Sequence, residues 1–142
     1  MVDRVLVPVD GSEQADIACE FVFDTFPDAT LVLLHVVNPA EASYGAQVSI
    51  PTASEEWYEN EKARAQREFD DIVARADERG IETETVIEVG KPTTFIVDFA
   101  EENDIDHVVM GSHGRKGVSR ILLGSVAETV VRRSAVPVTV VR

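Results

Sequence analysis

The sequence predicts an α/β protein: a three-layer, doubly wound fold in which five parallel strands form one sheet between two layers of helices. Strand patterns alternate with helix patterns along the chain, as in sheets built from right-handed crossovers. Residues 29–37 form a nearly continuous apolar run, which is typical of a strand covered on both faces. Because the chain has 142 residues and is 44% hydrophobic, we expect a single domain over residues 1–142.

The first strand and helix are predicted from the N-terminal segment. Residues 2–9 are mostly apolar, and Pro8 lies near the end of this strand, where a missing backbone N–H matters least. Asp10 begins a turn, and Ser12 is placed to cap a helix that reaches about Phe26. We therefore expect a strand, a short turn and a helix in this order.

The middle of the chain predicts a buried strand over 29–37, a long connection, a long helix and a charged strand. Residues 38–54 contain prolines, a glycine and small residues without periodicity, and a connection of this length is typical of a lid. Apolar positions at helical spacing favour an amphipathic helix over 55–79, closed by Gly80. Residues 81–89 alternate with acids, as in an edge strand whose charges discourage unwanted pairing.

The last part of the chain predicts a helix over 93–103, a strand over 106–110, a helix over 125–134 and a final strand over 136–141. The final strand contains Pro137, so we place it at an edge of the sheet. It carries no charge, and an uncharged edge favours pairing with a second copy as a symmetric homodimer. The alternative is an edge covered by loops of the same chain.

A glycine-rich loop joins the fourth strand to the last helix, where residues 111–125 read GSHGRKGVSRILLGS. Glycines reach positive φ without steric cost, so backbone amides can converge on an anion beside the positive end of a helix dipole. The loop also holds Arg115, Lys116 and Arg120 and no acid. It therefore predicts a phosphate-binding loop, and the alternative is a wide connection without a ligand.

Two better-known phosphate loops are excluded. A Walker A loop needs Ser or Thr after its lysine, whereas Lys116 is followed by Gly117. A dinucleotide fingerprint needs three spaced glycines in the first strand-to-helix turn, where this chain has only Gly11. The glycine loop is consequently of a different class.

Composition excludes several classes of protein. The formal net charge of −13 argues against binding to nucleic acid, because phosphates would be repelled by most of the surface. No window is long and apolar enough for a membrane span, and the N-terminus reads as a strand, so we expect a soluble, cytoplasmic protein. The single cysteine, Cys19, is expected to be buried, and no zinc-ligand spacing is present. An acidic, lysine-poor surface suits a halophilic source.

Several motifs together resemble the universal stress protein family, in its UspA-like form. They are Val-Pro-Val-Asp10-Gly-Ser, Leu-His35-Val-Val, Val-Gly90-x-Pro92, Met-Gly-Ser-His-Gly and Leu-Leu-Gly-Ser125-Val, spread over the whole chain. The spacing Gly111-x2-Gly114-x9-Gly124-Ser125 is similar to the loop of the ATP-binding branch. The resemblance implies a Rossmann-like or flavodoxin-like sheet of order 3-2-1-4-5, as in adenine nucleotide alpha hydrolases, with ATP at the switch point and a homodimer through residues 136–141.

The same resemblance implies ten ligand-binding residues. Three would surround adenine and ribose, with Asp10 accepting bonds from ribose hydroxyls, one would offer its backbone to adenine, one would pack on the nucleoside, and five would hold phosphates. In that order they are Pro8, Val9 and Asp10; Val36; Met110; and Gly111, Gly114, Gly124, Ser125 and Val126.

For some of these residues, a purely structural role without a ligand stays open as an alternative. Asp10 also suits a local turn, and Ser125 also suits a capping box with Glu128, which would explain both without a ligand. His113 is either a phosphate donor or a solvated loop histidine. We assign no catalytic residue and no metal site.

We expect a nucleotide-dependent regulatory protein of the stress response, in which bound ATP orders residues 38–54 and alters a surface for an unknown protein partner. The ligand is ATP, with AMP or ADP as alternatives, with or without Mg²⁺. One rival is a slow ATPase that acts with a partner, with weak hydrolysis at most. The other is a nucleotide-free structural or chaperone-like dimer.

Overall fold

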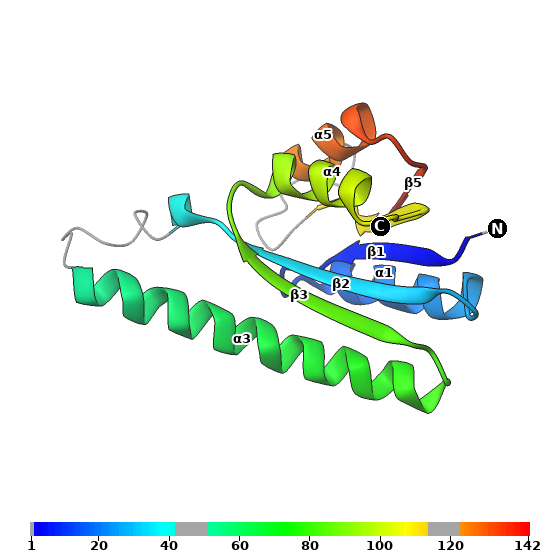
Figure 1. The fold of residues 1–142 in the computed structure, drawn as a ribbon, viewed down its shortest axis with the longest axis horizontal. Coiled ribbons are helices and arrows are strands. Elements are labelled where there is room, and N and C mark those ends of the chain that lie inside the picture. Colours follow the sequence, from blue (N-terminus) through cyan, green and yellow to red (C-terminus); the bar gives the residue numbers. More distant parts are fainter. Residues whose placement is uncertain (1, 42–50, 114–122) are drawn as a thin grey trace.

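The computed structural model describes residues 2–41, 51–113 and 123–142 (Figure 1). Strands and helices alternate along these residues, as the sequence predicts. The elements are β1 (Arg4–Pro8), α1 (Glu13–Thr25), β2 (Thr30–Val37), α3 (Pro51–Glu78), β3 (Thr83–Val89), α4 (Pro92–Glu102), β4 (His107–Gly111), α5 (Ser125–Arg133) and β5 (Val138–Val141).

The five strands form one parallel sheet of order β3-β2-β1-β4-β5, which confirms the expected fold and strand order. On one side of β1, Val7 is in register with Leu33 of β2, and on the other side Leu6 is in register with Val108 of β4. The strand order therefore reverses at β1. In open parallel sheets, this reversal leaves a crevice at the carboxyl ends of the strands.

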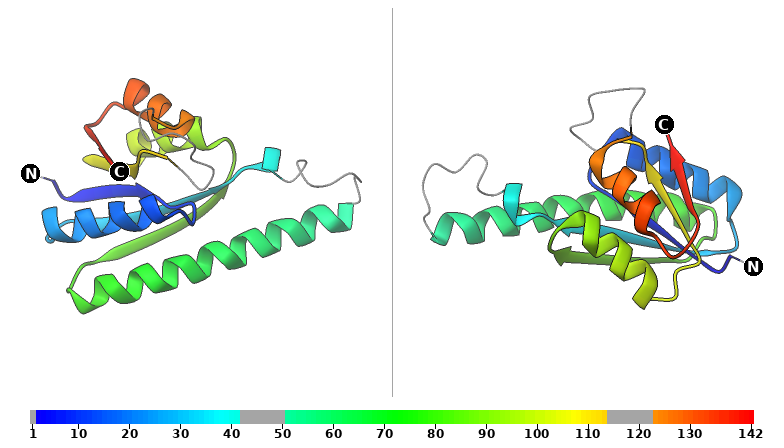
Figure 2. Two further views of the ribbon diagram at one scale, coloured as in Figure 1. Left: turned by 180° about the vertical axis from the view of Figure 1, so that it is seen from behind. Right: turned by 90° about the horizontal axis from the view of Figure 1, so that it is seen from above.

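Helices cover both faces of the sheet, as the apolar strands require (Figure 2). Val5 and Val7 of β1 belong to a buried cluster with α1 and α3, whereas Leu6 belongs to a second cluster with α4 and α5. This alternation follows from the two-residue period of a strand. Each face of the sheet thus has its own apolar core, and the structure has three layers.

The two edge strands are β3 and β5, as predicted from their sequences. β3 contains only half-buried and exposed residues, and its acids, Glu84 and Glu88, are exposed. The ordered part of β5 begins at Val138, so Pro137 precedes the strand instead of lying within it. Proline is tolerated there because its backbone makes no ladder bond through N–H.

The segment 38–54 differs from the expected loop. Residues 39–41 are helical, and α3 begins at Pro51, four residues before the expected start of this helix. Proline suits the first turn of a helix, because the N–H that it lacks would have no helical partner there. In the sequence, the prolines of this segment were instead interpreted as signs of a loop. Residues 42–50 lie outside the described part of the chain.

None of the helices in the described residues is both long and apolar enough to cross a lipid bilayer.

Cys19 lies on the buried side of α1, as predicted, and its thiol is free. Burial raises the pKa of this thiol to about 12. The thiol is therefore protonated near neutral pH, and Cys19 acts as a small apolar core residue.

Candidate functional site

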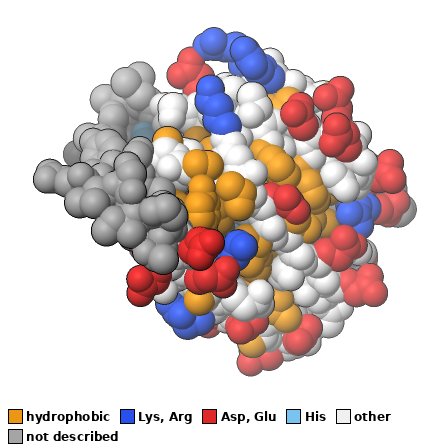
Figure 3. Space-filling view, turned by 60° about the vertical axis from the view of Figure 1, so that its left-hand side comes forward, with side chains coloured by type: hydrophobic (Ala, Val, Ile, Leu, Met, Phe, Trp, Pro, Cys, Tyr) orange, Lys and Arg blue, Asp and Glu red, His pale blue; other side chains and the backbone are white. Residues whose placement is uncertain are grey.

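A cavity of about 530 Å³ opens at the carboxyl ends of the strands. Volumes of this size are typical of small-molecule sites. Figure 3 looks toward this end of the molecule and shows apolar side chains gathered on the face, with charged side chains beside them. The apolar part of the wall includes Pro8, Leu34, Val36, Ile96 and Met110, which come from β1, β2, α4 and β4.

The structure brings nine of the ten predicted ligand-binding residues together on the wall of this one cavity. The tenth, Gly114, lies outside the described residues, as do Arg115, Lys116 and Arg120. The nine are Pro8, Val9, Asp10, Val36, Met110, Gly111, Gly124, Ser125 and Val126. They come from both sides of β1, so the reversal of strand order is what assembles them.

Asp10 follows the last residue of β1 and shapes the turn into α1. Its Oδ1 accepts a hydrogen bond from the backbone N–H of Ser12 at 3.0 Å, which is an Asx turn. Ser12 in turn is the N-cap of α1, because its hydroxyl oxygen accepts from the N–H of Ala15 at 3.1 Å. The local role of Asp10 is thus real, and it coexists with a place on the cavity wall.

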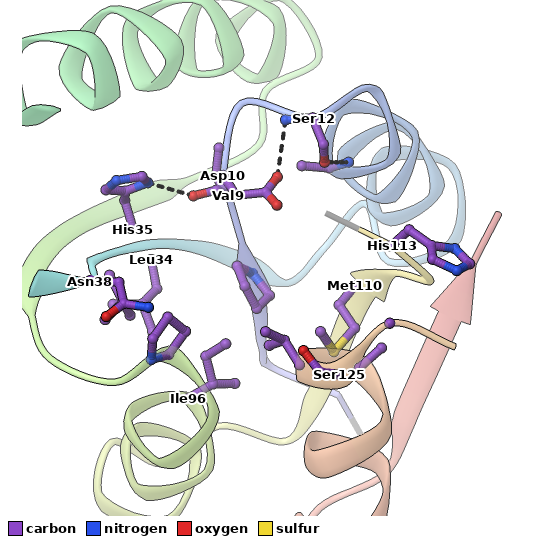
Figure 4. Close-up of a pocket in the computed structure, with 18 of the residues that line it drawn as sticks. Val9, Asp10, Ser12, Leu34, His35, Asn38, Ile96, Met110, His113 and Ser125 are labelled. Carbon is purple, nitrogen blue, oxygen red and sulfur yellow. Dashed lines mark hydrogen bonds between the residues drawn. The ribbon is translucent and has the colours of Figure 1, made fainter. Parts of the chain in front are cut away.

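His35 ties β2 to the end of β1 beneath the cavity (Figure 4). Its Nδ1 lies 2.7 Å from the carbonyl oxygen of Val9, and only 6% of the residue is exposed. A carbonyl oxygen can only accept, so Nδ1 carries the proton and donates. The backbone N–H of Val9 donates to the carbonyl of Leu34 at 2.8 Å. Val9 is therefore held through both of its backbone polar groups.

The N-terminal end of α5 faces the cavity, and the capping box that was the alternative role for Ser125 is absent. Gly124 is the N-cap, Ser125 is already the first helical residue, and no side chain caps this end. Glu128 instead bonds Arg132 at 2.5 Å. A helix start without a side-chain cap leaves N–H groups of the first turn available to another acceptor, and an anion suits them best.

The two ends of the glycine loop are joined by a short backbone contact. The N–H of Gly124 donates to the carbonyl of Ser112 at 2.7 Å, and the N–H of Ser112 donates to the carbonyl of Val141 at 2.7 Å. His113 follows at the same neck, with its Nδ1 3.2 Å from the hydroxyl of Ser112. Both Ser112 and His113 line the cavity, and Figure 4 shows His113 on the side opposite His35.

Gly111 and Gly124, near the two ends of the glycine loop, are needed because neighbouring residues approach them closely. The sequence instead predicted glycines with positive φ. The positive-φ glycines of the described residues are elsewhere, and Gly124 has a φ of −67°. A Cβ at Gly111 would lie 2.4 Å from Cβ of Gln14 in α1, and a Cβ at Gly124 would lie 3.1 Å from the carbonyl oxygen of Ser112. Glycine therefore lets α1 and the loop neck come near the cavity.

Two acids on the wall were not predicted. Glu41 follows β2, and Glu61 comes from α3 with only 12% of its side chain exposed. Neither acid belongs to a family motif. Glu41 lies in the segment that was interpreted as a loop, and Glu61 lies on a helix whose charged residues were interpreted as solvated. The helical spacing of Glu61 to the apolar Ala65 was the signal that could have identified it, since residues four apart share one face of a helix.

The cavity is electrically uneven. Acids line the part next to β1, β2 and α3, whereas the start of α5 and the neck of the glycine loop line the part next to β4. Hydroxyl or amino groups suit the acidic part, because carboxylates accept hydrogen bonds. Anionic groups suit the other part, where a helix presents its N–H groups and dipole.

Comparison with known proteins gives a consistent family. The family model described as "Universal stress protein family" matches residues 1–142. Universal stress protein MJ0577 of Methanocaldococcus jannaschii is 35% identical over 155 residues, which cover 100% of this chain and 96% of that protein. The solved structure of MJ0577 has a TM-score of 0.88 at 34% identity and covers 99% of this chain and 96% of its own.

Other solved structures share the fold. The universal stress protein UspA from Lactobacillus plantarum has a TM-score of 0.87 at 26% identity, covering 99% of this chain and 98% of its own. A universal stress protein in complex with cAMP has a TM-score of 0.70 at 24% identity, covering 99% and 97%. A family protein from Arabidopsis thaliana with AMP bound has a TM-score of 0.71 at 19% identity, covering 98% and 90%. With a family model that spans the whole chain and a relative of this similarity, the chain belongs to the universal stress protein family.

Proposed function

We propose that the protein binds ATP in the cavity at the carboxyl ends of β1, β2 and β4 and works as a nucleotide-dependent regulator in the stress response. The observation that carries this proposal is the gathering of nine residues, chosen from sequence motifs, on the wall of one cavity. A volume of about 530 Å³ suits a ligand of nucleotide size. Adenine nucleotides are bound in two solved proteins that share the fold.

The charge distribution supports one orientation of the nucleotide. The ribose would lie near Asp10, whose carboxylate accepts hydrogen bonds from hydroxyls. Adenine would lie between β2 and α4, against Val36 and Ile96. The phosphates would lie at the start of α5, where Ser125 and Val126 offer backbone N–H groups. The opposite orientation would place phosphates against carboxylates and is disfavoured by charge.

A regulatory role is favoured because residues on both sides of the segment 42–50 line the cavity. Glu41 precedes residues 42–50 and Glu61 follows them, and both line the cavity. A ligand that contacts these two side chains would therefore influence the connection between β2 and α3. The surface so altered would bind a protein partner, and the protein would act in the cytoplasm as one domain.

The proposal also includes a homodimer through β5. This strand is a sheet edge, and each of its four residues is only half-buried. The backbone of Pro137 and Val141 bonds to β4, so alternate residues 138 and 140 direct their polar groups to the outer side of the sheet. Pairing with β5 of a second copy would satisfy them.

The test is calorimetric titration of the protein with ATP and with Mg-ATP, using two variants of Ser125. This side chain is exposed and makes no cap bond, so it can be replaced without loss of a contact that starts α5. Ser125→Glu places a negative charge at the start of the helix, which favours the helix dipole but repels phosphate. Ser125→Gln has the same size without the charge and is the matched control.

We expect the wild type to bind ATP, Ser125→Glu to bind at least about tenfold more weakly, and Ser125→Gln to lie between them near the wild type. Absence of heat at millimolar ligand for the wild type would overturn the proposal and favour the nucleotide-free dimer. Equal weakening by Glu and Gln would contradict the placement of phosphates at α5. Mass spectrometry of co-purifying nucleotide would distinguish ATP from AMP or ADP.

A further inference from the structure

Glu61 is a carboxylate in a position where α3 otherwise carries apolar residues. Ala65, Phe69 and Ile72 are buried against the sheet, and Glu61 precedes Ala65 by one turn on the same face. Figure 1 shows that the N-terminal part of α3 extends past the carboxyl edge of the sheet. The face that covers the sheet therefore covers the cavity one turn earlier, and it does so with an acid.

The residues that follow Glu61 on α3 bring this helix close to the turn after β1. α3 lies across the turn after β1, because a Cβ at Gly11 would come within 2.5 Å of the carboxylate of Glu68. Arg64 lines a smaller cavity of about 280 Å³ together with Gly11. Arg64 is the ion-pair partner of Glu61, and Glu61 and Asp10 both line the larger cavity.

The ion pair leaves one oxygen of Glu61 available. Oε2 accepts from Nη2 of Arg64, and in the described part of the chain Arg64 is the one residue that bonds this carboxylate. Only 12% of the side chain is exposed, so the remaining oxygen, Oε1, is in a setting where charge is poorly screened. A carboxylate so placed accepts hydrogen bonds from hydroxyl groups and repels phosphates.

We propose that Glu61 is a specificity-determining residue that restricts the cavity to nucleotides whose ribose carries free 2′ and 3′ hydroxyls. This inference rests on the proposed function and names the ligand class more narrowly. Asp10 supplies the first acceptor for the ribose, and Glu61 adds a second negative charge from α3, which lies in the same helical layer as α1. A nucleotide with an additional phosphate on the ribose would meet both charges.

The experiment compares 5′-AMP with adenosine 2′,5′-bisphosphate and adenosine 3′,5′-bisphosphate by calorimetry. We expect the wild type to bind both bisphosphates at least about tenfold more weakly than AMP, because like charges would be brought together. Glu61→Gln keeps the shape and an acceptor oxygen but removes the charge. In this variant we expect the ratio of bisphosphate to AMP dissociation constants to fall by about tenfold.

Glu59→Gln is the matched control. Glu59 lies on the same helix and also faces a basic residue three positions on, Lys62 at 3.9 Å, but its side chain is 76% exposed and does not line the cavity. Its discrimination ratio should equal that of the wild type. A general effect of α3 on folding would alter all three dissociation constants together and leave their ratio unchanged.

The outcomes distinguish failure of the proposed role of Glu61 from failure of the proposed function. Equal binding of AMP and the bisphosphates by the wild type, or an unchanged ratio in Glu61→Gln, overturns the role of Glu61 and leaves nucleotide binding in place. Failure of the wild type to bind AMP and ATP overturns the proposed function, and the inference with it.

Discussion

The imidazole Nδ1 of His35 lies 2.7 Å from the carbonyl oxygen of Val9, so a side chain of β2 holds the residue that directly follows β1. Asp10 follows Val9 directly, and its position on the cavity wall depends on this contact. A buried carbonyl without a partner costs about 1 to 3 kcal/mol. The histidine thus positions the residue that would meet ribose.

Replacement of His35 by leucine should destabilise the fold by about 1 to 3 kcal/mol and weaken ATP binding, because the Val9 carbonyl loses its donor. His35→Asn should retain most of both properties, since the amide nitrogen of asparagine can donate from nearly the same place as Nδ1. Urea unfolding measures the stability and calorimetry the binding. Equal losses of stability and of ATP affinity in the two variants would show that the imidazole ring matters and that its N–H donor does not.

Gly111→Ala should lower both stability and ATP affinity. The added methyl group would lie 2.4 Å from Cβ of Gln14, so α1 must move away from the cavity, at a cost of about 1 to 3 kcal/mol. Gly80→Ala is the comparison, because its φ of 70° is strained for alanine although no atom lies within 4 Å. Gly80→Ala should cost about 1 kcal/mol and leave ATP affinity unchanged. A loss of affinity in both variants would point to global instability.

Cys19 should resist thiol reagents at pH 8 in the folded protein and react rapidly in urea, because burial raises the pKa of its thiol to about 12. Above about pH 8.5 the unfolded chain loses this proton while the folded protein keeps it. Stability should therefore fall as pH rises from about 9 toward 12, by up to about 1.4 kcal/mol per pH unit from this group. Cys19→Ala should show a shallower slope, and an equal slope would contradict the assignment.

Val140→Pro should dissociate the proposed homodimer. Residue 140 directs its N–H to the outer side of β5, so proline removes a donor needed for pairing while the bonds to β4 remain. Light scattering after size exclusion gives the mass of each species. Val140→Ala keeps the N–H and loses side-chain volume, and it should stay dimeric. A monomeric wild type would contradict the dimer itself.

Potassium chloride should stabilise the protein against urea, because a net charge of −13 is unfavourable in a compact state at low ionic strength. The effect should be largest below about 0.15 M, where the Debye length still exceeds about 8 Å. Unfolding midpoints at several salt concentrations provide the measurement. Midpoints that do not move with salt would count against a halophilic adaptation.

Apolar runs and helical spacing predicted the elements and the three layers, because these are local signals. The strand order and the residues of the cavity wall were predicted from the resemblance to the universal stress protein family. The sequence left a capping box open as an alternative role for Ser125, and it is absent because Gly124 takes the cap position, which the motif alone does not reveal. Glu61 was missed because burial of one acid on a long helix depends on how far α3 extends past the sheet. The reason for glycine at 111 was also missed, since a contact with Gln14 exists only in three dimensions.

The central position of β1 has a consequence for how the chain folds during synthesis. β1 pairs with β2 soon after both leave the ribosome, with Val7 opposite Leu33, but its other side awaits β4, where Val5 meets His107. Until then the nascent chain exposes an apolar strand edge that can pair with other molecules. A ribosomal pause before β4 would lengthen this exposure, and one after β4 would not.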